Sequence, residues 1–393
     1  MTLLFWFCAF VLAYPLFIYP LLLEICCRWQ GKKISPPTSM QNNVPPSLPA
    51  VSILLSVYNE AANIQKKIDN FLALDYPPDS LELLIVSDGS DDGTDAIAAS
   101  NESERIRLLR QEGRLGKTAA LNLAATQAKG EVLFFTDADS MLAPNAVTLL
   151  VRPLYWSLPD PSHTPGQTSG VGLTSGRSVY RDACGTETTG SVYRQYEEWQ
   201  KTREGRLWGI SGADGAAYAM KKDLYTPLPP QYINDLLHPI QVILAGQSAI
   251  TLPDALVHEE ATEHSPATEF SRQTRIMAQS WRIFCSHVYP LVQARQWGFI
   301  WQFVSHKPLR WLSLPAMILL GVSSVSLLPA ILPMLALLSL TTICLCAWLG
   351  LKGKAGLPGR ICLLFMLQGL AALNGLWHYA LGNTFTTWKP RGK

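Results

Sequence analysis

Residues 134–140 read FFTDADS, an apolar segment that ends in two aspartates spaced one residue apart. Alternate side chains of a strand lie on the same face, so Asp137 and Asp139 can both point into one site at the strand's carboxyl end. Carboxylate oxygens are hard ligands that suit Mg²⁺ or Mn²⁺, and such an ion neutralises a bound diphosphate. An Asp-x-Asp pair also occurs in ordinary solvated turns, so its meaning depends on the segments around it.

Apolar and amphipathic segments alternate around this pair. Continuous apolar runs, typical of buried parallel strands, occupy residues 51–57, 81–86, 106–109 and 131–135. Helical patterns occupy residues 61–74, 95–100 and 118–127. This alternation predicts an α/β fold whose mostly parallel sheet is covered by helices on both faces. Ligands of such sheets bind outside the carboxyl ends of the strands, so the polar residues after each strand are candidate site residues.

The apolar residues of the chain gather at its two ends. The chain has 393 residues, of which 48% are hydrophobic and 16% charged. The uncharged run from Leu3 to Leu23 is long enough to cross a hydrocarbon core of ~30 Å. A cleaved signal peptide is the alternative, but the run lacks a basic segment before it and a clear cleavage site. The basic residues Arg28, Lys32 and Lys33 place its C-terminal end in the cytoplasm.

The C-terminal third predicts two to three further spans. Residues 309–350 are long enough for two, and residues 361–381 form a third candidate. The basic residues at 352–360 and at 389–393 should both be cytoplasmic, which three full spans after a cytoplasmic domain do not allow. Either one segment is interfacial or re-entrant, or one basic cluster departs from the rule.

Charge and cysteine content exclude several classes of function. The net charge of +2 is too small to suggest binding of nucleic acid. No Cys-x-x-Cys pair occurs, and most of the eight cysteines lie in or beside apolar segments, so disulfide and metal-thiolate frameworks are not expected. The histidines lack zinc-ligand spacing. We expect residues 258–260, of sequence HEE, to lie at the surface.

The turn after the second predicted strand carries Asp88 and Gly89. A calcium loop would need an acidic residue where Ala99 stands, so that interpretation fails. A turn that caps the next helix is one remaining interpretation. The functional one is that Asp88 accepts hydrogen bonds from a nucleobase or ribose, while Gly89 permits close approach of the backbone.

A glycine-rich segment, GRLGK at 113–117, precedes the helix that we predict from Thr118. It lacks the spacing of a Walker motif, which disfavours ATP hydrolysis. A Gly-Lys pair at a helix N-terminus can still hold a nucleotide phosphate or a base edge, which makes Lys117 a candidate. The alternative is a loop with a solvated lysine.

Taken in order, these segments resemble the family 2 glycosyltransferases with the GT-A fold, over roughly residues 51–284. The matching motifs are VYNE at 57–60, Asp88, GKTAALN at 116–122 and DAD at 137–139. The resemblance is to membrane-anchored bacterial members related to polysaccharide synthases. It implies that the following residues bind the nucleotide sugar: Asn59, Glu60, Asp88, Gly89, Lys117, Asp137 and Arg275. It implies that Asp137 and Asp139 hold Mn²⁺ or Mg²⁺.

The second half of the predicted domain resembles the acceptor side of that family. Residues 210–220 resemble its glycine-rich acceptor-side strand, which makes Gly212, Ala213 and Asp214 acceptor-side candidates; close strand packing is an equally good explanation of the small residues. Asp235 stands where the family has the second acidic residue of a pair, the general base, while Asn234 replaces the first. The alternative is that Asp235 caps the following helix.

Residues 272–276, RQTRI, stand where processive family members carry Gln-x-x-Arg-Trp. Arg275 matches the arginine, which resembles a diphosphate clamp. Ile276 replaces the tryptophan that serves as a platform for a growing glycan, although Trp281 could compensate. Processive synthesis is therefore disfavoured.

The sequence thus predicts an inverting glycosyltransferase in a bacterial inner membrane, multi-pass, with its catalytic domain in the cytoplasm. The donor is expected to be a nucleotide sugar, preferably a UDP-sugar, and the acceptor a lipid-linked or polysaccharide molecule of cell-envelope or exopolysaccharide synthesis. A processive polysaccharide synthase with a glycan channel and a non-catalytic scaffold subunit are the alternatives. The expected divisions are an anchor (1–27), a linker (28–49), a GT-A domain (50–286), an interfacial segment (287–308), a transmembrane region (309–385) and a basic tail (386–393).

Overall fold

The computed structural model describes residues 1–30, 48–156, 170–181, 187–188, 192–260, 265–354 and 356–387. Most of the predicted linker, most of the predicted basic tail, His163, Cys184 and His264 lie outside these ranges. The chain divides into two compact units. We call them the sheet unit (Cys27–Thr262, Pro290–Phe299 and Thr386–Lys393) and the helical unit (Met1–Cys26, Glu263–Tyr289 and Ile300–Phe385).

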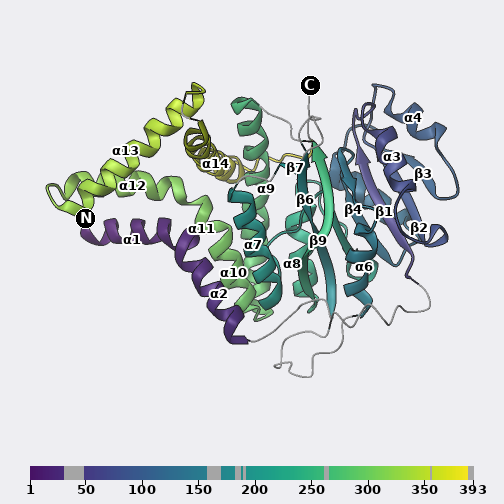
Figure 1. Cartoon of the computed structure of the whole chain (residues 1–393), viewed down its shortest axis with the longest axis horizontal. Coiled ribbons are helices and arrows are strands. Elements are labelled where there is room, and N and C mark those ends of the chain that lie inside the picture. Colours follow the sequence, from purple (N-terminus) through teal and green to yellow (C-terminus); the bar gives the residue numbers. More distant parts are fainter. Residues whose placement is uncertain are drawn as a thin grey trace. The chain divides into compact units, whose positions relative to one another are not determined.

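In the described part of the chain, the sheet unit is built on a nine-stranded sheet in the order β3-β2-β1-β4-β8-β6-β9-β5, with β7 paired to β6. Figure 1 draws the strands as arrows and the helices as coiled ribbons. Its strands are β1 (Val51–Val57), β2 (Leu81–Ser87), β3 (Ile106–Arg110), β4 (Val132–Thr136), β5 (Ser140–Leu142), β6 (Val171–Arg181), β7 (Glu187–Thr188), β8 (Ala217–Lys221) and β9 (Ser248–Glu260). The helices that connect them are α3 (Ile64–Leu72), α4 (Thr94–Ser100), α5 (Lys117–Gln127), α6 (Ala146–Trp156), α7 (Val192–Leu207) and α8 (Asn234–Leu244), with short 3₁₀ turns at Pro78–Ser80 and Lys222–Leu224.

The first half of the sheet is parallel. Strand β1 lies between β2 and β4, parallel to both, and β3 continues the parallel order beyond β2. In register, Val57 pairs with Ser87 and Leu55 with Thr136, so β1, β2 and β4 end at the same edge. Strand β8 then joins β4 in antiparallel fashion. The parallel half therefore brings the polar segments after three strands together.

Helices cover both faces of this sheet, as the alternating sequence pattern predicts. On one face, apolar residues of α3, α4 and α6 form a single core with alternate residues of β1, including Ile53 and Leu55. On the other face, α5 and α8 pack against Leu54 and Phe135. Because both faces are buried, each strand must be apolar at consecutive positions, and every residue of β1 and β2 is buried.

The strands and helices predicted for the parallel half lie within a few residues of those observed. One prediction for the second half of the sheet was wrong in part. Residues 210–220 were expected to form one strand, but β8 begins only at Ala217. Residues 210–216 form a turn in which the side chain of Asp214 accepts a hydrogen bond from the backbone N–H of Ala216, at 3.1 Å. Such a local hydrogen bond offers the backbone an alternative to the sheet.

The helical unit contains the apolar ends of the chain. Its elements, some of which extend into the sheet unit, are α1 (Thr2–Ala13), a π-helical turn (Tyr14–Ile18), α2 (Tyr19–Gln30), α9 (Pro266–Gln293), α10 (Trp297–His306), α11 (Pro308–Trp311), α12 (Ser313–Ser326), α13 (Ile331–Leu351) and α14 (Gly356–Ala380). Among the residues that the structure describes, three helical stretches are long and apolar enough to cross a membrane: Thr2–Trp29, Ile331–Leu351 and Gly356–Ala380. A fourth candidate, formed by α10–α11 and α12, is bent by 61°.

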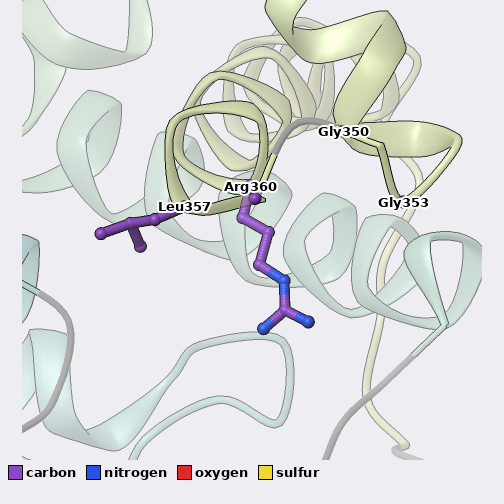
Figure 2. A pocket seen from close by; sticks show the side chains of 5 residues that line it. Gly350, Gly353, Leu357 and Arg360 are labelled. Carbon is purple, nitrogen blue, oxygen red and sulfur yellow. The ribbon is translucent and has the colours of Figure 1, made fainter.

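Helix α14 packs along α9 within the helical unit. The indole N–H of Trp281 donates to the carbonyl of Ala372 at 3.1 Å, and a Cβ at Gly375 would lie within 3 Å of Met277 and Ala278. A cavity of about 220 Å³ lies at the turn between α13 and α14 (Figure 2), and no predicted site residue lines it. Its lining consists of Gly350, Gly353, Gly356, Leu357 and Arg360.

A substitution at Gly130, just before β4, tests how closely β4 packs against β1. A Cβ at this position would lie 2.5 Å from the backbone nitrogen of Ser52 and 2.7 Å from the backbone carbon of Val51. Neither atom can move without shifting β1, so we expect Gly130→Ala to destabilise the protein by about 1–3 kcal/mol. A lower thermal unfolding midpoint in detergent would show this. In the matched control, Gly321→Ala, the new Cβ meets only a leucine methyl at 3.6 Å, and an equal loss in both variants would contradict the prediction.

Candidate active site

The carboxyl edge of β1, β2 and β4 brings most of the predicted site residues of the sheet unit together. Asn59 and Glu60 follow β1, Asp88 and Gly89 follow β2, and Asp137 and Asp139 follow β4. Lys117 is the first residue of α5, whose N-terminus faces the same edge through its ion pair with Asp137. The sequence could predict this convergence because parallel strands in register end together.

Asp88 orders the glycine-rich loop before α5. Its buried carboxylate accepts hydrogen bonds from the side chain of Gln111 (2.9 Å) and from the backbone N–H groups of Leu115 (2.7 Å) and Gly116 (3.0 Å). Gly116 has φ +95°, and a Cβ there would collide with the carbonyl oxygen of Thr386. Asp88 therefore fixes the loop that presents Lys117, and its contact with a nucleotide stays a prediction.

Asn59 and Glu60 tie the end of β1 to the loop after β2. Asn59 has φ 55°, and its side-chain amide exchanges two hydrogen bonds with Asp91, at 2.8 and 3.0 Å. The backbone N–H of Glu60 donates to the hydroxyl of Thr94 at 2.8 Å, and its carboxylate accepts from Asn63. Both residues therefore shape the edge of the site, and their predicted binding of nucleotide is not tested by these contacts.

Lys117 and Asp137 form an ion pair in which both side chains are about one-third exposed. Burial alone would lower the pKa of Lys117, but the carboxylates of Asp137, Asp235 and Asp139 raise it above its ordinary value. The lysine therefore stays charged and keeps a partly open face. An accessible cation at a helix N-terminus is a suitable site for a phosphate.

Asp235 lies at the second position of α8, close to this pair. The predicted alternative, a capping role, is wrong: α8 begins at Asn234, its N-cap is Ile233, and that cap makes no side-chain hydrogen bond. Burial, with the nearby carboxylate of Asp137, raises the pKa of Asp235, while Lys117 opposes this. A carboxylate whose pKa is raised is a stronger base, as general base catalysis requires.

The turn at residues 212–215 packs against Asp235. The N–H of Ala213 donates to the carbonyl of Asp235 at 2.8 Å, and a Cβ at Gly215 would lie 3.1 Å from its carboxylate. Gly212 has room for a Cβ, whose nearest neighbours would be Leu236 and the carbonyl of Asp235. The small residues of this turn therefore leave the carboxylate of Asp235 free of crowding.

Asp214 is tied to strand β6. Its carboxylate accepts the backbone N–H of Ser178 at 2.8 Å, and its own N–H donates to the hydroxyl of Ser175 at 2.7 Å. These bonds fix the turn on the sheet. A direct contact of Asp214 with an acceptor remains a prediction.

Several charged or aromatic residues near the site were not singled out from the sequence. The guanidinium of Arg114 lies 3.8 Å above the ring of Tyr58, next to the loop ordered by Asp88. Lys201 of α7 lies 3.8 Å from Glu198, and although burial would lower its pKa, Glu198 and further carboxylates, Asp235 among them, raise it. Arg114 and Lys201 lie in segments that the family resemblance covers, but only the folded structure shows that they lie near the site.

Residues 258–260 were expected at the surface, and Glu259 departs from that expectation. It is buried and accepts hydrogen bonds from Ser178 (2.8 Å) and Tyr180 (3.2 Å). Its place on β9 next to Ser140 of β5, at the end of the aspartate motif, explains the burial. The pairing of β5 with β9 joins residues far apart in the chain, so the sequence pattern around Glu259 does not reveal it.

Arg275 lies on α9, in the helical unit, and is half-buried there. Its neighbour Arg272 pairs with Glu269 at 2.9 Å. The predicted role of Arg275 as a diphosphate clamp stays a prediction.

Asp137 and Asp139 offer two oxygen ligands for a divalent metal. Within the described part of the chain, no group of three or more His, Cys, Asp or Glu side chains is placed to hold an ion by itself. Two carboxylates fit a metal that takes its other ligands from phosphate and water, as Mg²⁺ commonly does.

Part of this chain is similar in sequence to known glycosyltransferases. Residues 52–160 match the family model described as glycosyl transferase family 2. Glycosyltransferase AglE of Haloferax volcanii is 39% identical over 95 residues, which are 24% of this chain and 31% of the relative. Beta-monoglucosyldiacylglycerol synthase of Nostoc sp. is 35% identical over 129 residues, which are 32% of this chain and 27% of the relative. The matched region thus spans less than a third of either relative.

Among solved structures, the mannosyltransferase PcManGT from Pyrobaculum calidifontis, in complex with GDP-Man and Mn²⁺, aligns over 96% of this chain and 99% of its own. The TM-score is 0.69 and the sequence identity is 21%, so this likeness shows the fold. The predicted α/β fold is confirmed. Residues 52–160 therefore carry the match to glycosyl transferase family 2, within a chain that has the GT-A fold.

Proposed function

We propose that this chain is a membrane-associated, inverting glycosyltransferase that moves a sugar from a nucleotide donor, preferably a UDP-sugar, to a lipid-linked or polysaccharide acceptor. The observation that carries the proposal is the Lys117–Asp137 ion pair at the carboxyl edge of the sheet, with the raised pKa of Asp235 beside it. The names of the relatives support a sugar transfer. The lipid acceptor implied by the Nostoc relative's name agrees with the apolar helices here.

The nucleotide would lie on the loops after β1 and β2. Asp88 holds the loop at 115–117 in place, and that loop presents Lys117 to a diphosphate. The stacked pair of Tyr58 and Arg114 offers a flat surface on which a nucleobase could extend the stack. Lys117 would then stabilise the negative charge that grows on the departing diphosphate.

Asp137 and Asp139 would hold Mg²⁺ or Mn²⁺ together with the diphosphate. The ion, when bound, supplies positive charge that stabilises the leaving phosphates. Asp137 would exchange its partner Lys117 for the ion, and Lys117 would be freed for the phosphates. The Mn²⁺ in the Pyrobaculum structure supports a divalent ion.

Asp235 would act as the general base. Its carboxylate takes the proton of the acceptor hydroxyl, whose oxygen forms a bond to the anomeric carbon from the face opposite the departing diphosphate. The bond between that carbon and the diphosphate oxygen breaks, and the nucleoside diphosphate leaves with the electron pair. A general base of this kind contributes about 10²–10⁴-fold to the rate.

Packing in the helical unit supports single transfer over processive synthesis. Trp281 was the candidate to replace the missing tryptophan at Ile276. Its side chain is only 7% exposed, stacks edge-on against Trp311, and donates its N–H to Ala372. A ring held in this way does not offer its face to a glycan.

The packing of α14 supports an interfacial rather than a fully spanning position for that helix. Residues 372–375 of α14 lie against residues 274–281 of α9. Helix α9 carries Glu269, Arg272 and Arg282, and charged side chains are costly to place in a hydrocarbon core. An interfacial α14 satisfies the requirement that both C-terminal basic clusters be cytoplasmic. On this proposal, the sheet unit faces the cytoplasm of a bacterial inner membrane.

The role of Asp235 predicts a selective loss of turnover. We expect Asp235→Asn to lower kcat by about 10²–10⁴-fold, because the amide cannot accept the proton. Donor affinity should change little, since the nucleotide contacts lie elsewhere. The assay is Mn²⁺-dependent release of nucleoside diphosphate by the detergent-purified protein across a panel of sugar nucleotides. The control, Asp254→Asn, changes an exposed aspartate of β9. Failure of the wild-type protein to turn over any donor, with native lipids added, would favour a non-catalytic scaffold.

The raised pKa of Asp235 predicts a shift in the pH dependence of kcat. The base must be ionised, so the rate falls as the pH drops through its pKa. Because burial raises that pKa, the acid limb should lie above the ordinary aspartate value of about 4. A profile that stays flat down to that value would argue against Asp235 as the base.

The contacts of Asp88 predict a loss of nucleotide binding. Removing its carboxylate in Asp88→Ala leaves the N–H groups of Leu115 and Gly116 without their partner, which costs about 1–3 kcal/mol per buried group. We expect weaker binding of UDP by isothermal titration, together with a lower unfolding midpoint. In the control variant Asp91→Ala, which loses an exposed contact with Asn59, binding should be affected less.

A further inference from the structure

Helix α3 carries a lysine that is almost fully buried. Lys67 is 1% exposed, although it lies on a short amphipathic helix whose other lysine, Lys66, faces solvent. Its ammonium donates to the hydroxyl of Thr136 at 2.8 Å and to the backbone carbonyl of Ser140. These two acceptors lie on either side of the Asp137–Asp139 segment. The ammonium of Lys67 therefore forms hydrogen bonds at both ends of that segment.

A second residue of α3, one turn further along, continues this connection. The side-chain amide of Asn70 donates to the carbonyl of Leu142 and accepts its N–H, both at 2.9 Å. Asn70 thus pairs with Leu142 as a neighbouring strand would. Together, Lys67 and Asn70 hold the chain from Thr136 to Leu142 at four hydrogen bonds.

Burying this lysine does not favour the stability of the fold, because a charged group loses its hydration. Burial lowers the pKa of Lys67 to about 7, against the pull of Asp137, Asp139 and Glu259. A side chain such as methionine could fill the same space without desolvating a charge. The lysine instead supplies donors directed at the segment that carries the two aspartates.

We propose that Lys67 and Asn70 are positioning residues that fix the Asp137–Asp139 segment in the geometry a divalent metal requires. The inference rests on the proposed function, since it assumes that these aspartates hold the metal with a nucleoside diphosphate. Residues that orient metal ligands in this way typically change metal affinity by 10–100-fold when they are replaced.

The test measures metal binding directly. Full-length protein in detergent is titrated with Mn²⁺ in the presence of UDP, and in parallel GDP, and free Mn²⁺ is followed by electron paramagnetic resonance. We expect Lys67→Met to raise the Mn²⁺ concentration at half-saturation by about tenfold or more. The matched control is Lys66→Met, which removes an exposed lysine whose ion pair with Glu260 spans 3.8 Å. It should bind Mn²⁺ as the wild-type protein does.

Two milder variants guard against a Lys67→Met protein that does not fold. Thr136→Val keeps the shape but removes one acceptor of Lys67, and Asn70→Asp removes the donor to Leu142. Each should raise the half-saturating Mn²⁺ concentration, by less than Lys67→Met does. A lower unfolding midpoint with unchanged Mn²⁺ half-saturation would mean a purely structural role and would overturn the inference. If the wild-type protein binds no Mn²⁺ with either diphosphate, the proposed function fails first, and this inference with it.

Discussion

The convergence of carboxylates at one edge of the sheet is the constraint on which the site depends. Parallel strands that end in register place Asp88, Asp137 and Asp139 near one another, and α8 adds Asp235. Each carboxylate makes ionisation of its neighbours less favourable, and burial, with the nearby carboxylate of Asp137, raises the pKa of Asp235. Three helices supply the opposite charge through buried or half-buried lysines. These lysines are Lys67 of α3, Lys117 of α5 and Lys201 of α7.

The sequence could predict the parallel half of the sheet because its signals are local. A strand buried on both faces is apolar at every position, and the polar residues that follow it mark its end. Lys67 could have been found in the same way. It lies three residues after Ile64 and four before Phe71, on the face that α3 buries. Leu72, the last residue of α3, lies outside that face and is 53% exposed. A cation in the middle of an apolar stripe is the sequence signal for this buried lysine.

The remaining features depend on contacts between distant segments. Residues 210–216 contain small apolar residues that fit a strand, but the bonds of Asp214 to Ser175 and Ser178 turn the chain there. Glu259 is buried because β9 pairs with both β5 and β6. Trp281 fits an aromatic platform by its position in the sequence, and only the folded structure shows its ring packed against Trp311. None of these partners is near in sequence, so periodicity and spacing do not contain the information.

The Lys117–Asp137 pair also bears on the order of events in the proposed reaction. If Asp137 held a metal ion without a diphosphate, it would give up its ion pair with Lys117, and the ammonium of Lys117 would then lie near a second positive charge. A diphosphate that arrives alone would draw Lys117 away and leave the carboxylates of Asp137 and Asp139 facing the phosphates. Each of these two separate binding steps leaves like charges facing one another inside a partly buried site. Electrostatic repulsion is stronger there than in open solvent. Binding of the metal and the diphosphate as one complex exchanges one ion pair for two, so the nucleotide sugar and its ion should enter together.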